Sequence, residues 1–118
     1  MDAPAVDMLR ARHEVAYHPT YIDEHARLLA AAPECDAFIV RNRTQVRGEL
    51  LAALKDCRII GRLGVGMDNL DMDECARRGI RVFPALGANA LSVAEYVVTS
   101  ALVLLRGAYA STPAVAEG

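Results

Sequence analysis

The 118-residue sequence lacks an excess of either charge. Thirteen lysines and arginines stand against fifteen aspartates and glutamates, for a formal net charge of −2, and the arginines are scattered between acids. Domains that bind nucleic acid carry a basic patch or stripe. The composition therefore argues against a nucleic-acid partner.

Cysteines are few and show no pairing pattern. Cys35, Cys57 and Cys75 are odd in number and widely spaced, with no C-x-x-C pair and no clustered histidines. This argues against a disulfide framework and against a zinc site, and it favours a reducing compartment. Because residues 1–12 also lack the apolar segment of a signal peptide, we expect a cytoplasmic protein.

Long apolar runs are absent as well. The most apolar window, residues 93–105, contains Glu95 and is shorter than the roughly 20 residues that a bilayer span requires. It predicts a buried helix, and we expect no membrane partner. With 53% hydrophobic residues, the chain has enough apolar material for the core of one globular domain.

What the sequence does have is an alternation of strand and helix patterns. Apolar runs predict strands at 37–40, 58–63 and 80–83, the first buried on both faces, and a weak edge strand at 13–17. Three- and four-residue spacing of apolar residues predicts helices at 4–12, 23–32, 44–54, 71–78 and 91–106. Asp2 and Thr44 are the expected N-caps of the first and third of these helices. Such alternation requires crossover connections, which predict an α/β fold with a parallel sheet and helices on both faces.

The last predicted helix differs from the others. Ser92 is its expected N-cap and Glu95 occupies the third helical position, which together form a capping box. The helix is apolar on most sides, more than a helix covering one small sheet can bury, so we expect something else to cover it. Residues 107–118 are small and without pattern, and they predict a linker or frayed end.

A glycine turn follows the strand at 58–63. Gly64 and Gly66 permit a tight turn and let backbone N–H groups approach a ligand with no Cβ in the way. Bare N–H groups ahead of a helix N-terminus carry partial positive charge, so they can hold a carboxylate or phosphate without a cationic side chain. We interpret the turn as a loop for a substrate anion, with a purely structural turn as the alternative.

The same turn falls short of a dinucleotide-binding fingerprint. Gly64-x-Gly66-x-x-Asn69 has asparagine at the third position of G-x-G-x-x-G. The next strand ends in Phe83 and Pro84, with no acid to bind a ribose hydroxyl. A dinucleotide site is therefore the least favoured interpretation of this turn.

A second polar loop follows the strand at 37–40. Arg41 could pair with a carboxylate, and Asn42 and Thr44 could orient hydroxyl groups. The alternative is a helix cap with solvated arginines, and Arg43 is the better candidate for a surface charge. Because the carboxyl ends of parallel strands meet at one edge of a sheet, this loop and the glycine loop are expected to form the two halves of a cleft.

Other titratable residues give weaker signals. His13, His18 and His25 lie in no recognisable catalytic order and are expected at the surface. The acids at 68, 71, 73 and 74 are expected from the dipole of a first helical turn and are not assigned to catalysis.

Three motifs in order, VRNRT at 40–44, GRLGVGMDNLD at 61–71 and NALSVAE at 89–95, closely resemble the D-isomer-specific 2-hydroxyacid dehydrogenases, phosphoglycerate dehydrogenases in particular. The resemblance covers residues 36–106. It implies a flavodoxin-like substrate-binding domain over 1–90, an interdomain and dimer helix over 91–106, and a tail over 107–118. It also implies that the family's first strand and its inserted Rossmann domain, with the dinucleotide fingerprint and the catalytic arginine, glutamate and histidine, lie outside this sequence.

The resemblance assigns site residues by position. Arg41 and Asn42 would face the substrate, the N–H groups of the glycine loop would hold its carboxylate, and Asn89 would stand at the domain boundary. Val65 departs from the threonine frequent in phosphoglycerate dehydrogenases, which leaves the exact substrate open. The implied substrate-binding residues are Arg41, Asn42, Gly64, Val65 and Gly66, and the implied cofactor-binding residues are Val65 and Asn89.

Two functions are compatible with the sequence. The first is the substrate-binding portion of an NAD- or NADP-dependent oxidoreductase for a small 2-hydroxy or 2-keto acid, homodimeric through the helix at 92–106. Alone it would neither bind NAD tightly nor catalyse hydride transfer, because that transfer requires a bound dinucleotide. The second is a non-catalytic flavodoxin-like module that binds an anion or dimerises.

Overall fold

The computed structural model describes residues 1, 3–107 and 115–116. Contacts divide the chain into two compact units, Met1–Ala85 and Leu86–Gly118, and each is described by itself below. The expected N-cap Asp2 and most of the predicted tail lie outside the described residues.

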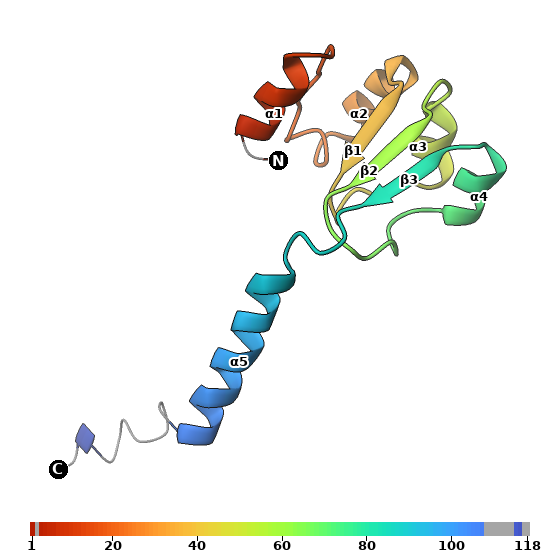
Figure 1. Cartoon of the computed structure of the whole chain (residues 1–118). Coiled ribbons are helices and arrows are strands. Elements are labelled where there is room, and N and C mark those ends of the chain that lie inside the picture. Colours follow the sequence, from red (N-terminus) through yellow and green to blue (C-terminus); the bar gives the residue numbers. More distant parts are fainter. Residues whose placement is uncertain (2, 108–114, 117–118) are drawn as a thin grey trace. The chain divides into compact units, whose positions relative to one another are not determined.

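The first unit is built on a parallel sheet, which confirms the predicted α/β class. Strands β1 (Ala37–Val40), β2 (Ile59–Arg62) and β3 (Arg81–Pro84) lie in the order β1-β2-β3 (Figure 1). Both strand pairs are parallel and share one register, in which Phe38 pairs with Ile60 and Ile60 with Val82. The carboxyl ends of β1 and β2 therefore lie next to each other at one edge of the sheet.

One face of the sheet carries the hydrophobic core. Residues in register share a face, so Phe38, Ile60 and Val82 point to the same side, where Ile60 is fully buried. The helical layer on that side consists of α2 (His25–Ala31), η1 (Ala32–Glu34), α3 (Gly48–Ala53) and α4 (Met72–Arg77). The buried cluster comprises Ala32, Val40, Val46, Leu50, Leu51, Leu54, Cys57, Ile60, Leu70, Cys75 and Ile80.

The opposite face of the sheet is open within the first unit. Ile39 is 42% exposed and Phe83 is 52% exposed, on either side of Gly61. The prediction that β1 is buried on both faces is therefore wrong, since the helical layer covers the Phe38 side only.

The N-terminal region matches the sequence in part. Helix α1 (Ala3–Arg10) forms as predicted, and all three histidines are exposed. The edge strand expected at 13–17 is wrong, because this segment pairs with no strand in the described residues. Helix α2 (His25–Ala31) ends one residue before the predicted bound at 32, and Pro33 sits in the first turn of η1 (Ala32–Glu34), where its missing N–H breaks no helical hydrogen bond.

Helix α3 begins four residues later than expected. Thr44 is not its N-cap, since the helix starts at Gly48 after an extended Arg47. Val46 instead forms a parallel bridge with Leu70 and is fully buried there. The pairing of Val46 with Leu70 competes with helix formation, so the helix begins only after Arg47.

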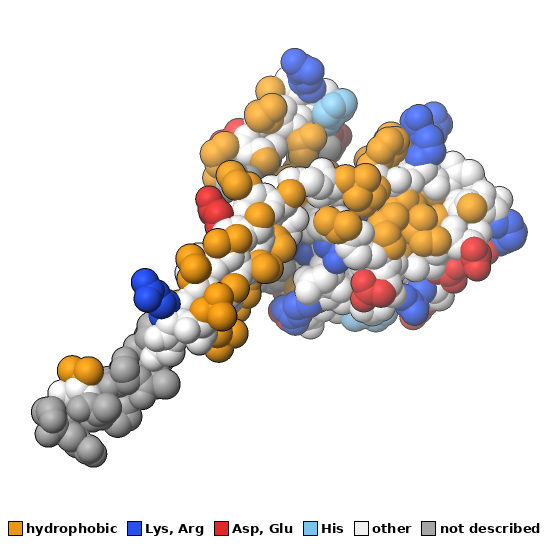
Figure 2. Space-filling model, turned by 60° about the horizontal axis from the view of Figure 1, so that its bottom comes forward, with side chains coloured by type: hydrophobic (Ala, Val, Ile, Leu, Met, Phe, Trp, Pro, Cys, Tyr) orange, Lys and Arg blue, Asp and Glu red, His pale blue; other side chains and the backbone are white. Residues whose placement is uncertain are grey.

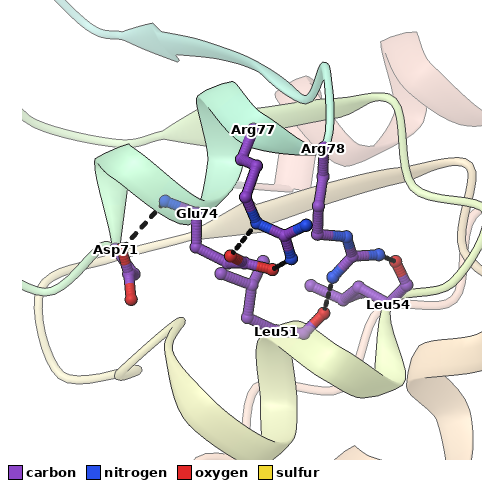
Figure 3. A network of polar contacts seen from close by, with 6 residues as sticks. All are labelled: Leu51, Leu54, Asp71, Glu74, Arg77 and Arg78. Carbon is purple, nitrogen blue, oxygen red and sulfur yellow. Dashed lines mark hydrogen bonds and ion pairs between the residues drawn. The ribbon is translucent and has the colours of Figure 1, made fainter.

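Helix α4 is fixed at both ends by polar contacts (Figure 3). The Asp71 carboxylate accepts a hydrogen bond from the N–H of Glu74 at 3.0 Å, so Asp71 is the N-cap. After the helix, the Arg78 guanidinium donates to the carbonyl oxygens of Leu51 and, at 2.5 Å, Leu54. Because α3 ends at Ala53, these carbonyl oxygens have no partner within the helix, and Arg78 supplies one. Arg78 thus joins α3 and α4.

The second unit is dominated by α5 (Ala90–Arg106). It begins two residues before Ser92, with Asn89 at the N-cap, so the predicted capping box of Ser92 and Glu95 is wrong. The turn at 86–89 leads directly into the helix, since the N–H of Val93 already bonds the carbonyl oxygen of Asn89 at 2.9 Å. Gly107, with φ of 58°, ends it in the left-handed conformation.

Most side chains of α5 are apolar and exposed. Figure 2 shows hydrophobic side chains along this helix, and no residue of α5 is buried by the described part of the chain, contrary to the predicted buried helix. Among the described residues, no helix has both the length and the apolar character needed to cross a membrane.

Candidate functional site

A single buried asparagine joins the two polar loops at the carboxyl edge of the sheet. Asn69 is 1% exposed, and its Nδ2 donates to the carbonyl oxygens of Arg41 at 2.9 Å and Thr44 at 2.7 Å. Its Oδ1 is buried and has no partner among the described residues. The loop after β1 and the loop after β2 are thus held together, as the topology predicted.

Backbone contacts reinforce this junction. The N–H of Val46 donates to the carbonyl oxygen of Asn69 at 2.8 Å, and the N–H of Asp71 donates to that of Val46 at 3.1 Å. The Arg47 guanidinium also bonds the carbonyl oxygen of Asp68. Together with the two hydrogen bonds of Asn69, five hydrogen bonds therefore fix one loop against the other.

The backbone of the glycine loop divides into a bonded part and a free part. The N–H of Leu63 donates to Val40 at 2.8 Å, and the N–H of Gly64 donates to Arg62 at 2.9 Å. In the described residues, no acceptor bonds the N–H groups of Val65, Gly66 or Met67. The donors available to a ligand are these three, and the Gly64 N–H is already used.

Gly64 is required at its position for two reasons. Its φ of 145° lies in a region that residues with a Cβ rarely adopt. A Cβ built there would lie 1.8 Å from Nη1 of Arg62, whose side chain folds against the loop. The expectation that backbone N–H groups bind an anion here without a cationic side chain is therefore incomplete, because the guanidinium of Arg62 packs against this loop.

The expected helix-dipole contribution is not found at the loop. Helix α4 starts at Met72, six residues after Gly66, and has only six residues. Its first turn is already capped by Asp71. The N–H groups at 65–67 are a feature of the loop and not of a helix N-terminus.

The remaining predicted site residues are exposed. Arg41 and Asn42 lie at the surface of the loop after β1, next to Arg43, whose ion pair with Asp23 at 2.6 Å is exposed. That ion pair agrees with the interpretation of Arg43 as a surface charge. Asn89 belongs to the second unit.

The cysteines are structural in character. Burial is the main cause that raises the pKa of the Cys35, Cys57 and Cys75 thiols above the ordinary value. All three are free, and thiols with raised pKa are poor nucleophiles. Within the described residues, no cluster of histidine, cysteine and acidic side chains is arranged to hold a metal ion.

Sequence reasoning missed two residues of the site. From the sequence, Asn69 is interpreted only as a mismatch in a dinucleotide fingerprint. Its place next to the apolar Leu70 was the available signal that its side chain is buried and hydrogen-bonded. Arg62 was read as part of a strand. Alternation along β2 places it on the same face as the buried Ile60, which was the available signal.

Comparison with protein families and known proteins gives a consistent result. Residues 1–117 match the family model described as the catalytic domain of D-isomer specific 2-hydroxyacid dehydrogenases. The chain is 51% identical over all 118 residues to the (S)-sulfolactate dehydrogenase of Chromohalobacter salexigens. It is 31% identical over 118 residues to the hydroxypyruvate reductase of Thermotoga maritima, and it spans 38% of the length of each of these relatives.

Other relatives match over less of the chain. The D-3-phosphoglycerate dehydrogenase of Mycobacterium tuberculosis is 46% identical over 88 residues, which are 75% of this chain and 16% of that protein.

Among solved structures, the PH0520 protein of Pyrococcus horikoshii superposes with a TM-score of 0.76 at 26% identity, over 100% of this chain and 35% of that one. The TT0316 protein of Thermus thermophilus, at 23% identity over 98% of this chain and 38% of that one, shares the fold with a TM-score of 0.75.

Proposed function

The chain belongs to the D-isomer-specific 2-hydroxyacid dehydrogenase family, and from this premise we propose that it is the substrate-binding portion of an NAD- or NADP-dependent oxidoreductase for a small 2-hydroxy acid. The observation that carries the proposal is the row of unbonded N–H groups at Val65, Gly66 and Met67, beside the loop of Arg41 and Asn42. Three free donors on consecutive residues suit the oxygens of a carboxylate.

The substrate class follows from the same loop and from the relatives. We propose that a carboxylate bound at residues 65–67 leaves the rest of a small acid within reach of the exposed Arg41 and Asn42, whose loop is tied to the glycine loop by Asn69. The names of the relatives include sulfolactate, hydroxypyruvate and phosphoglycerate, which are all small acids with a second functional group. We propose a substrate of this size and charge.

We propose that the cofactor and the catalytic groups are features of the whole enzyme and not of this chain alone. The chain spans 38% of the sulfolactate dehydrogenase that it matches. We propose that NAD or NADP binds mainly to a separate dinucleotide-binding domain, that Val65 contacts the cofactor, and that the 118-residue chain alone does not turn over substrate. The cofactor contact of Asn89, which belongs to the second unit, stays a prediction. We also propose that a second copy covers α5, since this helix presents Leu102, Leu104 and Leu105 uncovered.

The direct test is a binding experiment on the isotope-labelled 118-residue chain. Glycolate, the smallest 2-hydroxy acid, is expected to move the amide resonances of Val65, Gly66 and Met67, while NAD alone moves none of them. Shifts confined to surface arginines such as Arg43, with residues 65–67 unaffected, would contradict the proposal.

A chimera tests the dehydrogenase role against the non-catalytic alternative. The 118 matching residues of the Chromohalobacter salexigens sulfolactate dehydrogenase are replaced by this chain. We expect NAD-dependent oxidation of a 2-hydroxy acid to be retained. A folded chimera without any such activity would favour the non-catalytic module.

A further inference from the structure

Arg62 is a buried cation that forms no ion pair within the described residues. It is the last residue of β2, only 9% of its surface is exposed, and it starts on the helix-covered face of the sheet with Ile60. Its Nη1 donates to the carbonyl oxygen of Leu63 at 2.9 Å. Its buried Nε has no partner, and the guanidinium forms no ion pair in the part of the chain that the structure describes.

The guanidinium lies directly against the glycine loop. The Cβ position of Gly64 is 1.8 Å from Nη1, and the Cβ position of Gly66 is 3.9 Å from Nη2. The guanidinium therefore lies against the loop from Gly64 toward Gly66, which is the segment that carries the free N–H groups. The absence of a Cβ at Gly64 is what makes room for it.

This arrangement is unfavourable for the empty chain. Burying a charge costs free energy unless an opposite charge or a full set of hydrogen bonds compensates for it. The carboxylate of Asp68 lies on the same loop, with Oδ1 3.0 Å from the Cβ position of Gly66, but Asp68 is exposed and forms no ion pair with Arg62 among the described residues. An anion on the loop would supply the missing charge and accept from the free N–H groups at the same time.

We infer that Arg62 is a specificity-determining residue that supplies the counter-charge for an ionised acid group bound at residues 65–67. The inference rests on the proposed function and deepens it, because backbone N–H groups alone accept a neutral carbonyl as well as a carboxylate. With Arg62 behind the loop, the site selects a carboxylate or sulfonate over an uncharged amide of the same shape.

The test compares two probes of equal size, glycolate and glycolamide, on the labelled 118-residue chain. The amide shifts of Val65, Gly66 and Met67 give the affinity for each. We expect glycolate to bind more tightly than glycolamide by about tenfold or more, which is the range for a hydrogen bond to a charged group. Arg62→Gln is expected to lose most of this preference, and Arg62→Lys to keep part of it.

Arg43→Gln is the matched control, since it also removes one arginine from the same edge of the sheet but acts on an exposed ion pair. Its glycolate preference should equal that of the unmodified chain. If Arg62→Gln weakens both probes equally, Arg62 only supports the loop, and the inference fails while the proposed function stands. If neither probe moves residues 65–67 in the unmodified chain, both fail.

A second measurement needs no variant. The Nε–H resonance of Arg62 in the unmodified chain should shift with glycolate and not with glycolamide. Should Arg62→Gln fail to fold, this resonance decides the matter, and a signal indifferent to glycolate overturns the inference.

Discussion

Asn69 donates a hydrogen bond from Nδ2 to the carbonyl oxygen of Thr44 at 2.7 Å, across 25 residues of sequence. The same nitrogen bonds the carbonyl oxygen of Arg41 at 2.9 Å. The two loops that follow neighbouring strands therefore share one buried donor, and the position of Arg41 depends on it.

Removing this donor should weaken both the fold and the site. Asn69→Ala leaves two carbonyl oxygens without their partner, and we expect the free energy of unfolding to fall by about 2–4 kcal/mol. Urea unfolding measures this. Asn42→Ala, an exposed asparagine of the same loop, should change stability by less than about 0.5 kcal/mol, and equal losses in the two variants would contradict the assigned role of Asn69.

Two glycines with positive φ should respond differently to alanine. A Cβ added at Gly64 would lie 1.8 Å from Nη1 of Arg62. A Cβ added at Gly48, whose φ is 53°, would have no neighbouring atom within 4 Å. Gly48→Ala carries only the backbone strain, about 1–2 kcal/mol, and Gly64→Ala adds the displacement of a buried guanidinium. Chemical denaturation should therefore show a clearly larger loss for Gly64→Ala, and an equal loss would mean that the side chain of Arg62 does not pack there.

The contact between α3 and α4 should depend on Arg78 and not on its neighbour. Arg78→Met removes both donors to the carbonyl oxygens of Leu51 and Leu54, and we expect a loss of about 2–3 kcal/mol. Arg77→Met breaks only the ion pair of Arg77 with Glu74. Because Arg77 is exposed, the free energy of unfolding should fall by much less. Urea unfolding tests this ordering: if the two variants share the same dependence of the unfolding free energy on urea concentration, their midpoints compare their stabilities directly.

Buried thiols should make the fold less stable at alkaline pH. Burial raises the pKa of Cys75 in the folded chain above the ordinary value of 9.0. Below that value both states hold the proton; as the pH rises above it, the unfolded state loses the proton first, so the free energy of unfolding falls. Unfolding measured from neutral pH to pH above 9.0 should show this fall, and Cys75→Ala should make it shallower, whereas an unchanged slope would contradict it.

Association through α5 should be sensitive to one charge. Leu105 is 82% exposed on α5, and Met8 is 75% exposed on α1. If a second copy covers α5, burying a glutamate there is costly, so Leu105→Glu should shift the chain toward monomer in sedimentation. Met8→Glu is the control and should leave the mass unchanged; a compact monomer for the unmodified chain at high concentration would argue against the dimer.

The sequence predicted the elements whose signal is local. Continuous apolar runs identified the three strands of the described residues, and strand–helix alternation required their parallel order. Helical spacing identified α1, α2, α4 and α5 to within about two residues at each end. Errors arose where a distant partner competes with local preference. Thr44 has the residue type of an N-cap, but Val46 pairs with Leu70, so α3 begins only at Gly48. Residues 13–17 alternate like a strand, but no strand of the described residues lies beside them to pair with.

For the site, the sequence alone determined that polar loops with glycine follow β1 and β2, since residue type and order suffice for that. Only the tertiary structure decided which donors remain free and which charges are buried. Asn69 and Arg62 gain their roles from groups brought beside them by folding, namely two carbonyl oxygens of another loop and the open side of Gly64. Hydrogen bonding and burial depend on such three-dimensional neighbours, which the linear order of residues does not contain.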